Sequence, residues 1–133
     1  MTLKKNLIAN YRSTKHPPTI ELEGVWKNGL GSEMVLGVDA AGNVKGIYKT
    51  NVGMPASTEE FPLVGFASGD LISFTVNFGK YGSLTAWTGQ HTENEEGDPE
   101  IHTLWHLAEN ILDEQEPYHI WAGILAGSNR FTR

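Results

Sequence analysis

The stretch Gly82-Ser83-Leu84-Thr85-Ala86-Trp87-Thr88-Gly89-Gln90 decides the predicted fold, because it alternates with the period of a β-strand. In an extended strand Ser83, Thr85 and Trp87 share one face, and the residues between them share the other. A buried hydroxyl without a hydrogen-bond partner costs about 1–3 kcal/mol. Two hydroxyls beside an indole fit a strand that meets a polar ligand. This stretch alone favours the alternative, a solvated strand with one amphipathic tryptophan, and the ligand becomes the better interpretation because other strands repeat the pattern.

Similar short alternating segments recur along the chain between turn residues. We predict strands at 22–28, 32–38, 44–50, 61–67, 71–78, 82–90 and 120–132, and another that begins at 101. Residues 100–112 also fit helical spacing, but the Ile, Thr and Trp residues in their first half favour a strand. About eight short strands without a long helix indicate an all-β antiparallel sandwich or barrel. A closed up-and-down barrel would remove the exposed sheet edges and could hold one small ligand.

Length and composition limit the classes of protein to consider. The chain has 133 residues, enough for one domain with one core. We predict an N-terminal extension over 1–20, partly disordered because Pro17 and Pro18 discourage regular structure, and one domain over 21–133. The net charge of −6 disfavours nucleic acid and anionic membrane surfaces as partners, and no apolar run approaches a membrane span. The absence of cysteine excludes disulfides, thiolate metal sites and cysteine nucleophiles.

The N-terminal residues leave the compartment open. Residues 1–10 contain two lysines, but the apolar segment after them is shorter than the roughly 7–15 residues of a signal peptide. We expect either a protein that stays inside the cell or a mature form of an exported one.

The strand faces that carry tryptophan combine aromatic rings with hydroxyl and amide groups. This mixture is typical of a small-molecule site if the faces point inward. We place no lysine, histidine or carboxylate pair on these faces, so we predict no catalytic residue and a protein that is not an enzyme. The inward set is Trp26, Asn28, Ser32, Tyr48, Thr50, Phe78, Ser83, Thr85, Trp87, Trp105, Leu107 and Asn129.

The histidines give little evidence of a metal site. His102 and His106 are four residues apart but lack a third ligand, and we place His91 and His119 in loops. We therefore predict no bound metal.

Several motifs together resemble the avidin and streptavidin family and follow one another in that family's order. They are Gly24-Val25-Trp26-Lys27-Asn28-Gly29-Leu30-Gly31-Ser32, Gly46-Ile47-Tyr48-Lys49-Thr50, Phe74-Thr75-Val76-Asn77-Phe78, Ser83 to Gln90, Ile101-His102-Thr103-Leu104-Trp105 and Trp121 to Thr132. The resemblance covers about residue 22 to the end. It implies an eight-stranded antiparallel up-and-down β-barrel that binds biotin, or biotinylated molecules, with high affinity and without catalysis or a further cofactor.

The resemblance also implies roles for polar residues around the ureido ring of biotin. Asn28, Ser32 and Tyr48 match the family's donors to the ureido oxygen. Asn129 and Thr50 match the acceptors for the two ureido N–H groups.

Further roles implied by the resemblance concern the rest of the ligand and the assembly. Thr85 would meet the thioether sulfur, and a loop from Val52 to Ser57 would close over the site. Trp121 would enter a neighbouring subunit's pocket, so we expect a homo-oligomer, namely a tetramer. Family members are often secreted or periplasmic. The apolar walls would be Phe78, Trp87, Trp105 and Leu107; the carboxylate would lie near Ser83 and the backbone of Met54; and Leu104, His106 and Ile124 would face subunit interfaces.

Two other functions are alternatives. A lipocalin-like carrier of a small apolar ligand also has Gly-Val-Trp in its first strand, as at Gly24-Val25-Trp26. The short chain, the lack of cysteine and the many hydrogen-bonding groups disfavour it. A barrel enzyme is disfavoured by the missing acid–base pair.

Overall fold

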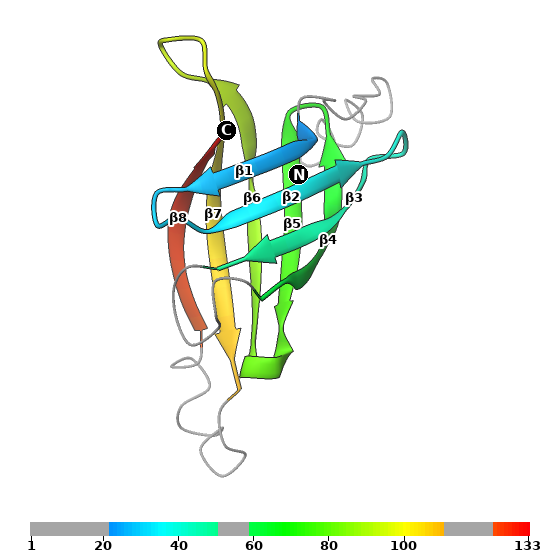
Figure 1. Ribbon diagram of the computed structural model, residues 1–133, viewed down its shortest axis with the longest axis vertical. Coiled ribbons are helices and arrows are strands. Elements are labelled where there is room, and N and C mark those ends of the chain that lie inside the picture. Colours follow the sequence, from blue (N-terminus) through cyan, green and yellow to red (C-terminus); the bar gives the residue numbers. More distant parts are fainter. Residues whose placement is uncertain (1–21, 51–58, 111–123) are drawn as a thin grey trace, which may run out of the picture.

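The computed structural model describes residues 22–50, 59–110 and 124–133, which form a closed antiparallel barrel of eight strands (Figure 1). The all-β closed barrel predicted from the sequence is confirmed. The 3₁₀ turn η2, Gly79–Tyr81, joins two of the strands. The strands are β1 Gly24–Asn28, β2 Glu33–Val38, β3 Asn43–Lys49, β4 Phe61–Ser68, β5 Leu71–Phe78, β6 Ser83–Glu93, β7 Pro99–Glu109 and β8 Ile124–Thr132.

Each strand pairs with the next, and β8 pairs with β1 to close the barrel. The closing seam is short, because it contains only the pairs Lys27 with Thr132 and Asn28 with Phe131. The strands β6 and β7 have eleven residues each, whereas β1 has five. In Figure 1 the long strands run along the long axis of the molecule and β1 to β4 cross it obliquely. Both sheet edges are thus paired within the described strands.

The inward faces of the strands form one hydrophobic core, as the alternation predicts. Trp26, Phe74 and Phe131 are among its largest fully buried side chains. Trp26 also donates a hydrogen bond of 3.0 Å from Nε1 to the carbonyl oxygen of Leu22. We predicted Trp26 among the residues facing a ligand, but it belongs to this core and does not line the cavity described below.

The end of the barrel near Trp26 is closed by ring and charge contacts. The Arg133 guanidinium lies 4.3 Å above the centre of the Trp26 ring, and His91 meets the edge of this ring at a centroid distance of 6.0 Å. His91 Nδ1 also lies 3.6 Å from Asp70 Oδ1. We expected a loop at His91, and this is wrong, since β6 extends to Glu93 and turns the His91 side chain into the barrel. The inference that no histidine lies on an inward face is wrong for the same reason.

In place of the predicted acidic loop from 91 to 100, the structure has a tight turn between β6, which ends at Glu93, and β7, which begins at Pro99. The side-chain oxygen of Asn94 accepts hydrogen bonds of 2.9 Å from the backbone N–H groups of Glu96 and Asp98. This side chain holds the turn in place of a longer irregular segment. Residues 1–21 and 111–123 lie outside the described part of the chain, so the predicted extension, the domain boundary, the acidic connection and the start of the last strand stay predictions there.

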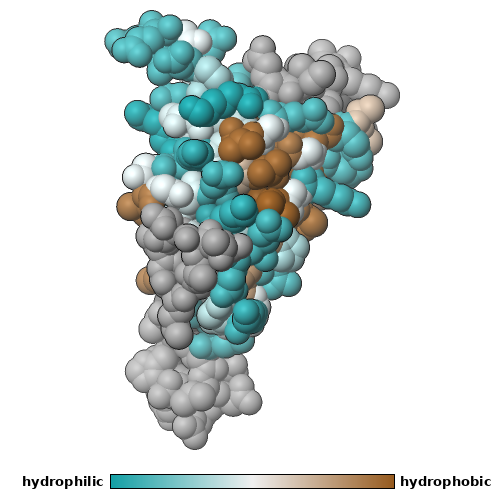
Figure 2. Space-filling model, in the orientation of Figure 1, coloured by the Kyte–Doolittle hydropathy of each residue, from teal (hydrophilic) through white to brown (hydrophobic). Residues whose placement is uncertain are grey.

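The outer surface of β1 to β4 is partly apolar. The strand register aligns Val25, Val35 and Ile47 across β1, β2 and β3, and hydrophobic surface crosses this face of the molecule (Figure 2). Within the described residues we find no helix with the length and apolar character that crossing a membrane requires.

Candidate ligand-binding site

A cavity of about 150 Å³ opens near η2 and the start of β6, whereas Trp26 meets His91 near the other end of that strand. It brings together most of the residues that we predicted to face a ligand, and it adds Leu30. Ser83, at the start of β6, does not line it, and Val52, Met54 and Trp121 lie outside the described residues. The lining is Asn28, Leu30, Ser32, Tyr48, Thr50, Phe78, Thr85, Trp87, Trp105, Leu107 and Asn129.

Asn28 ends β1 and turns its side-chain amide toward the cavity. Its Oδ1 accepts backbone hydrogen bonds of 3.0 Å each from Leu30 and Ser32, which hold the turn to β2. Its Nδ2 then points to the Tyr48 hydroxyl at 3.4 Å. Because the turn uses the oxygen, Asn28 offers the cavity an N–H donor.

Tyr48, on β3, lies beside Asn28 and Ser32. Burial raises the pKa of its hydroxyl, and hydrogen bonds from Ser32 and Asn28 partly oppose this shift. The hydroxyl therefore keeps its proton throughout the neutral range. Three polar side chains that can donate hydrogen bonds thus meet on the β1–β3 side of the cavity.

The opposite side carries Trp87 and Asn129. Trp87 Nε1 donates a hydrogen bond of 3.0 Å to Asn129 Oδ1. The indole itself lies between Tyr48 and Phe74, each with a ring centroid 5.1 Å away, and is nearly parallel to Phe74 at 14°. A carbonyl oxygen has two lone pairs, so Asn129 Oδ1 can still accept a hydrogen bond from a ligand.

Thr85 places a buried hydroxyl in the wall of the cavity. The residue is 2% exposed, and its Oγ1 has no hydrogen-bond partner among the described residues. An unsatisfied buried hydroxyl costs about 1–3 kcal/mol. A ligand atom that bonds this hydroxyl would recover that cost.

Trp105 takes its position because its cross-strand neighbour on β8 is a glycine. Gly127 pairs with Trp105, and a Cβ atom at 127 would lie 2.5 Å from Trp105 Cζ2. The missing side chain lets the indole lie flat on β8, and Trp105 stays half-buried at the cavity wall.

Phe78 forms the wall next to η2. Its ring meets Tyr48 almost perpendicularly at 5.9 Å and Phe61 at 4.7 Å. Leu30, which our sequence analysis missed, lies in the turn between β1 and β2 and is 58% exposed. A leucine between two glycines in a turn was the available signal, but strand alternation does not extend to turn residues.

The described lining contains no lysine, arginine, histidine or carboxylate. It therefore holds no acid–base pair among these residues, and it can bind a neutral polar group between apolar rings.

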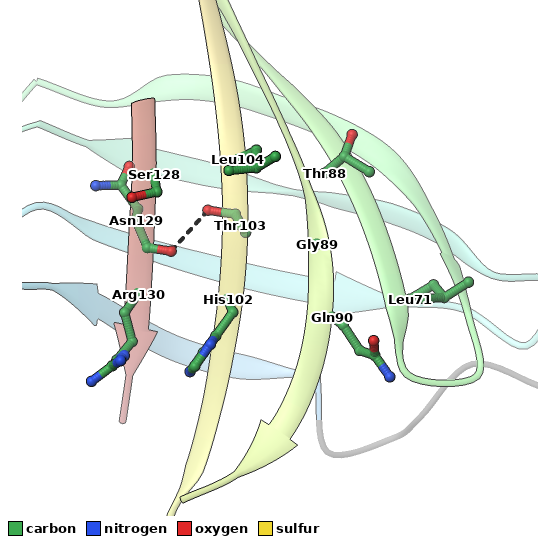
Figure 3. A pocket seen from close by; sticks show the side chains of 10 residues that line it. All are labelled: Leu71, Thr88, Gly89, Gln90, His102, Thr103, Leu104, Ser128, Asn129 and Arg130. Atoms are coloured by element: carbon green, nitrogen blue, oxygen red, sulfur yellow. Dashed lines mark hydrogen bonds between the residues drawn. The ribbon is translucent and has the colours of Figure 1, made fainter. Parts of the chain in front are cut away.

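A second, larger hollow of about 770 Å³ lies on the outer face of β5 to β8 (Figure 3). Leu71 and Leu104 are exposed there, beside Gln90, His102 and Arg130. This open surface combines apolar and hydrogen-bonding groups.

A buried carboxylate lies next to this hollow. Glu100 accepts a hydrogen bond of 2.9 Å from His102 Nε2, and Arg130 Nε lies 3.8 Å from the same oxygen. The hydrogen bond with His102, together with the charge of Arg130, lowers the pKa of Glu100.

The described residues thus form a closed eight-stranded barrel with a neutral, aromatic-walled cavity at one end. The chain belongs to the avidin family, whose model matches residues 16–133. It is 32% identical over 120 residues to avidin of Gallus gallus, an alignment that spans 84% of this chain and 77% of avidin. It is 33% identical over 118 residues to avidin-related protein 4/5 of the same organism, with the same coverage.

Solved structures agree with this assignment. The crystal structure of xenavidin superposes with a TM-score of 0.74 at 35% identity and covers 86% of this chain and 97% of xenavidin. The rhizavidin–biotin complex superposes with a TM-score of 0.67 at 31% identity and covers 82% and 96% of the two chains. Members of the family are non-catalytic binding proteins, so the prediction that this chain is not an enzyme is confirmed.

Proposed function

We propose that this protein binds biotin tightly and without catalysis in the cavity at the open end of the barrel. The observation that carries the proposal is the opposition of donors and an acceptor across one neutral cavity. Asn28 and Tyr48 lie on one side and Asn129 on the other, with aromatic rings between them. Biotin's ureido ring has one carbonyl oxygen and two N–H groups, which this arrangement matches. The related rhizavidin has been crystallised with biotin.

The ureido group is then held from both sides. Asn28, Ser32 and Tyr48 donate hydrogen bonds to its oxygen, while Asn129 and Thr50 accept from its N–H groups. The existing hydrogen bonds support these roles, because the turn occupies Asn28 Oδ1 and leaves Nδ2 as the donor. Asn129 Oδ1 keeps a lone pair after accepting from Trp87.

The remaining contacts surround the bicyclic ring and the acid tail. Thr85 donates to the thioether sulfur, which would satisfy its buried hydroxyl. Each aromatic ring of the wall can bury on the order of 150–250 Å². The ring is enclosed by Phe78, Trp87, Trp105 and Leu107, and the carboxylate lies near Ser83, the backbone of Met54 and Val52.

We also propose that the protein assembles as a homotetramer in which Trp121 completes a neighbouring subunit's site. The outer face of β5 to β8 supports an assembly, since Leu71 and Leu104 are 57% and 66% exposed on it. Native mass spectrometry with and without biotin tests the stoichiometry and the assembly size together. A monomer under both conditions would contradict the assembly. Trp121→Ala should weaken both biotin binding and the oligomer.

Titration calorimetry with biotin tests the binding proposal directly. We expect one biotin per chain, and retention of the protein on biotin-agarose. Asn28→Ala and Tyr48→Phe should each weaken binding by about 1–3 kcal/mol, because each leaves part of the ureido oxygen without a donor. Unchanged binding would contradict the assigned roles.

A lipocalin-like carrier would instead bind a fluorescent fatty acid and ignore biotin. Hydrogen-bonding side chains on both sides of the described cavity favour a polar ring over a lipid chain.

A further inference from the structure

A carboxylate and two residues of η2 form a cluster beside the cavity. Glu59 lies just before β4, and Tyr81 ends η2 between β5 and β6. The Tyr81 hydroxyl donates a hydrogen bond of 2.5 Å to Glu59 Oε1, and Lys80 Nζ lies 3.2 Å from Oε2. Both oxygens of one carboxylate therefore bind consecutive residues of the turn. The hydrogen bond with Glu59 also raises the pKa of Tyr81.

A series of ring contacts continues from this cluster into the cavity wall. The Tyr81 ring lies 6.0 Å from Phe61, and Phe61 lies 4.7 Å from Phe78. Phe78 in turn meets Tyr48 at 5.9 Å, and both line the cavity. Phe61 is buried and follows Glu59 by two residues. The carboxylate and the rings thus hold the same short segment against the wall that Phe78 forms.

The turn η2 is a firm support for this contact. Asn77 Oδ1 accepts a hydrogen bond of 2.8 Å from the Gly79 N–H, and Gly82 donates one of 3.0 Å to the Gly79 carbonyl. Gly82 adopts φ +79°, which favours glycine, and its carbonyl accepts from the Asn110 N–H at 2.8 Å. The turn is therefore bound to β5 and to the end of β7, so Tyr81 has a fixed position from which to hold Glu59.

We propose that Tyr81 is a positioning residue for ligand retention: through Glu59 it holds Phe61 against Phe78 and keeps this cavity wall in place. We call the Tyr81–Glu59 hydrogen bond the mouth latch. This inference rests on the proposed binding of biotin in the cavity. Because Tyr81 does not itself line the cavity, the latch acts on how long a ligand stays and leaves its polar contacts intact.

The test compares biotin dissociation and association rates in matched variants. Tyr81→Phe keeps the ring against Phe61 and removes the hydroxyl, and Glu59→Ala removes the acceptor. Each should speed dissociation by up to about tenfold, because the cavity wall that Phe61 and Phe78 form loses its support, with association within about twofold of wild type. Glu59→Gln keeps an oxygen acceptor and should restore most of the slow release.

Two controls separate the latch from general destabilisation. Lys80→Ala breaks an exposed ion pair with Glu59 and an exposed contact of the ammonium with the Tyr81 ring at 5.4 Å. Both contribute little, so release should stay nearly unchanged. The double variant Tyr81→Phe/Glu59→Ala should release biotin no faster than either single variant, because both remove the same contact. Dissociation rates within about twofold of wild type in both single variants would overturn the latch. Faster release that follows a fall in melting temperature in every variant, Lys80→Ala included, would also overturn it.

Hydrogen exchange in the ligand-free protein tests the latch independently of biotin binding. Hydrogen exchange at the Phe61 and Phe78 amides should be faster in ligand-free Tyr81→Phe than in wild type, and unchanged exchange overturns the latch. Failure of the wild-type protein to bind biotin would contradict the proposed function, while the exchange result would still decide the latch.

Discussion

The indole Nε1 of Trp87 donates a hydrogen bond of 3.0 Å to Oδ1 of Asn129, which joins β6 to β8 across the cavity. The two strands are not neighbours, because β7 lies between them. The bond fixes which end of the Asn129 amide faces Trp87, and so sets where an acceptor meets a ligand. The position of an apolar wall residue, Trp87, therefore determines the orientation of a hydrogen-bonding residue, Asn129.

This relationship predicts the effect of Trp87→Phe. The variant keeps an aromatic ring between Tyr48 and Phe74 but removes the N–H that orients Asn129. We expect biotin affinity to fall by about 1–2 kcal/mol, measured by titration calorimetry. In a double-mutant cycle with Asn129→Ala, the two losses should be less than additive. Full additivity would show that the indole acts through its ring alone.

The contact between Gly127 and Trp105 gives a second prediction. A methyl group at 127 would lie 2.5 Å from Trp105 Cζ2, so Gly127→Ala should push the indole off β8. We expect at least about a tenfold loss of biotin affinity, a cost typical of overpacking. Gly29→Ala is the control, since an added Cβ there meets nothing within 4 Å and should bind as wild type does. Equal affinities for the two variants would contradict the packing argument.

Glu100 predicts how stability responds to acid. Its pKa is lowered in the folded protein by the hydrogen bond with His102 and the nearby Arg130 charge. A carboxylate whose pKa is lower in the folded than in the unfolded state stabilises the fold at pH values above its unfolded-state pKa. This contribution is lost as the pH falls from the unfolded-state pKa through the folded-state pKa. Glu100→Gln should therefore lose less stability than wild type between about pH 5 and pH 3 in urea unfolding. If the free energy of unfolding falls equally with pH in wild type and Glu100→Gln, the Glu100 carboxylate does not cause the loss of stability in this pH range.

The closed end of the barrel predicts a variant that separates stability from binding. Arg133 lies 4.3 Å above the Trp26 ring and donates a hydrogen bond of 2.7 Å to the Glu23 carbonyl. Arg133→Met should lower the free energy of unfolding by about 1–2 kcal/mol. Biotin affinity should stay unchanged because the cavity lies at the other end. A parallel loss of affinity would show that the two ends are coupled.

Local pattern predicted the strands well because strand faces follow directly from sequence spacing. The predicted bounds of β5, 71–78, are those observed, and the alternation placed Thr85, Trp87 and Trp105 correctly on inward faces. Most other strand ends differ by one or two residues, since cross-strand hydrogen bonds decide where a strand stops.

The errors arose where position along the barrel mattered. Alternation assigns a residue to the inward face but does not say at which end it lies, so Trp26 was placed near a ligand although it packs in the core. His91 looked like a loop residue because an acidic segment follows it, yet pairing with β7 extends the strand past it. Contacts such as Trp87 with Asn129 join strands that only barrel closure brings together, and no local pattern contains them.

The direction of β8 has a practical consequence. Asn129 meets the cavity, whereas Arg133 lies over Trp26 at the far end. A linker or dye attached after Arg133 would leave from the side away from the entrance. On a sensor chip or an affinity resin, molecules tethered there would present their entrances to the sample.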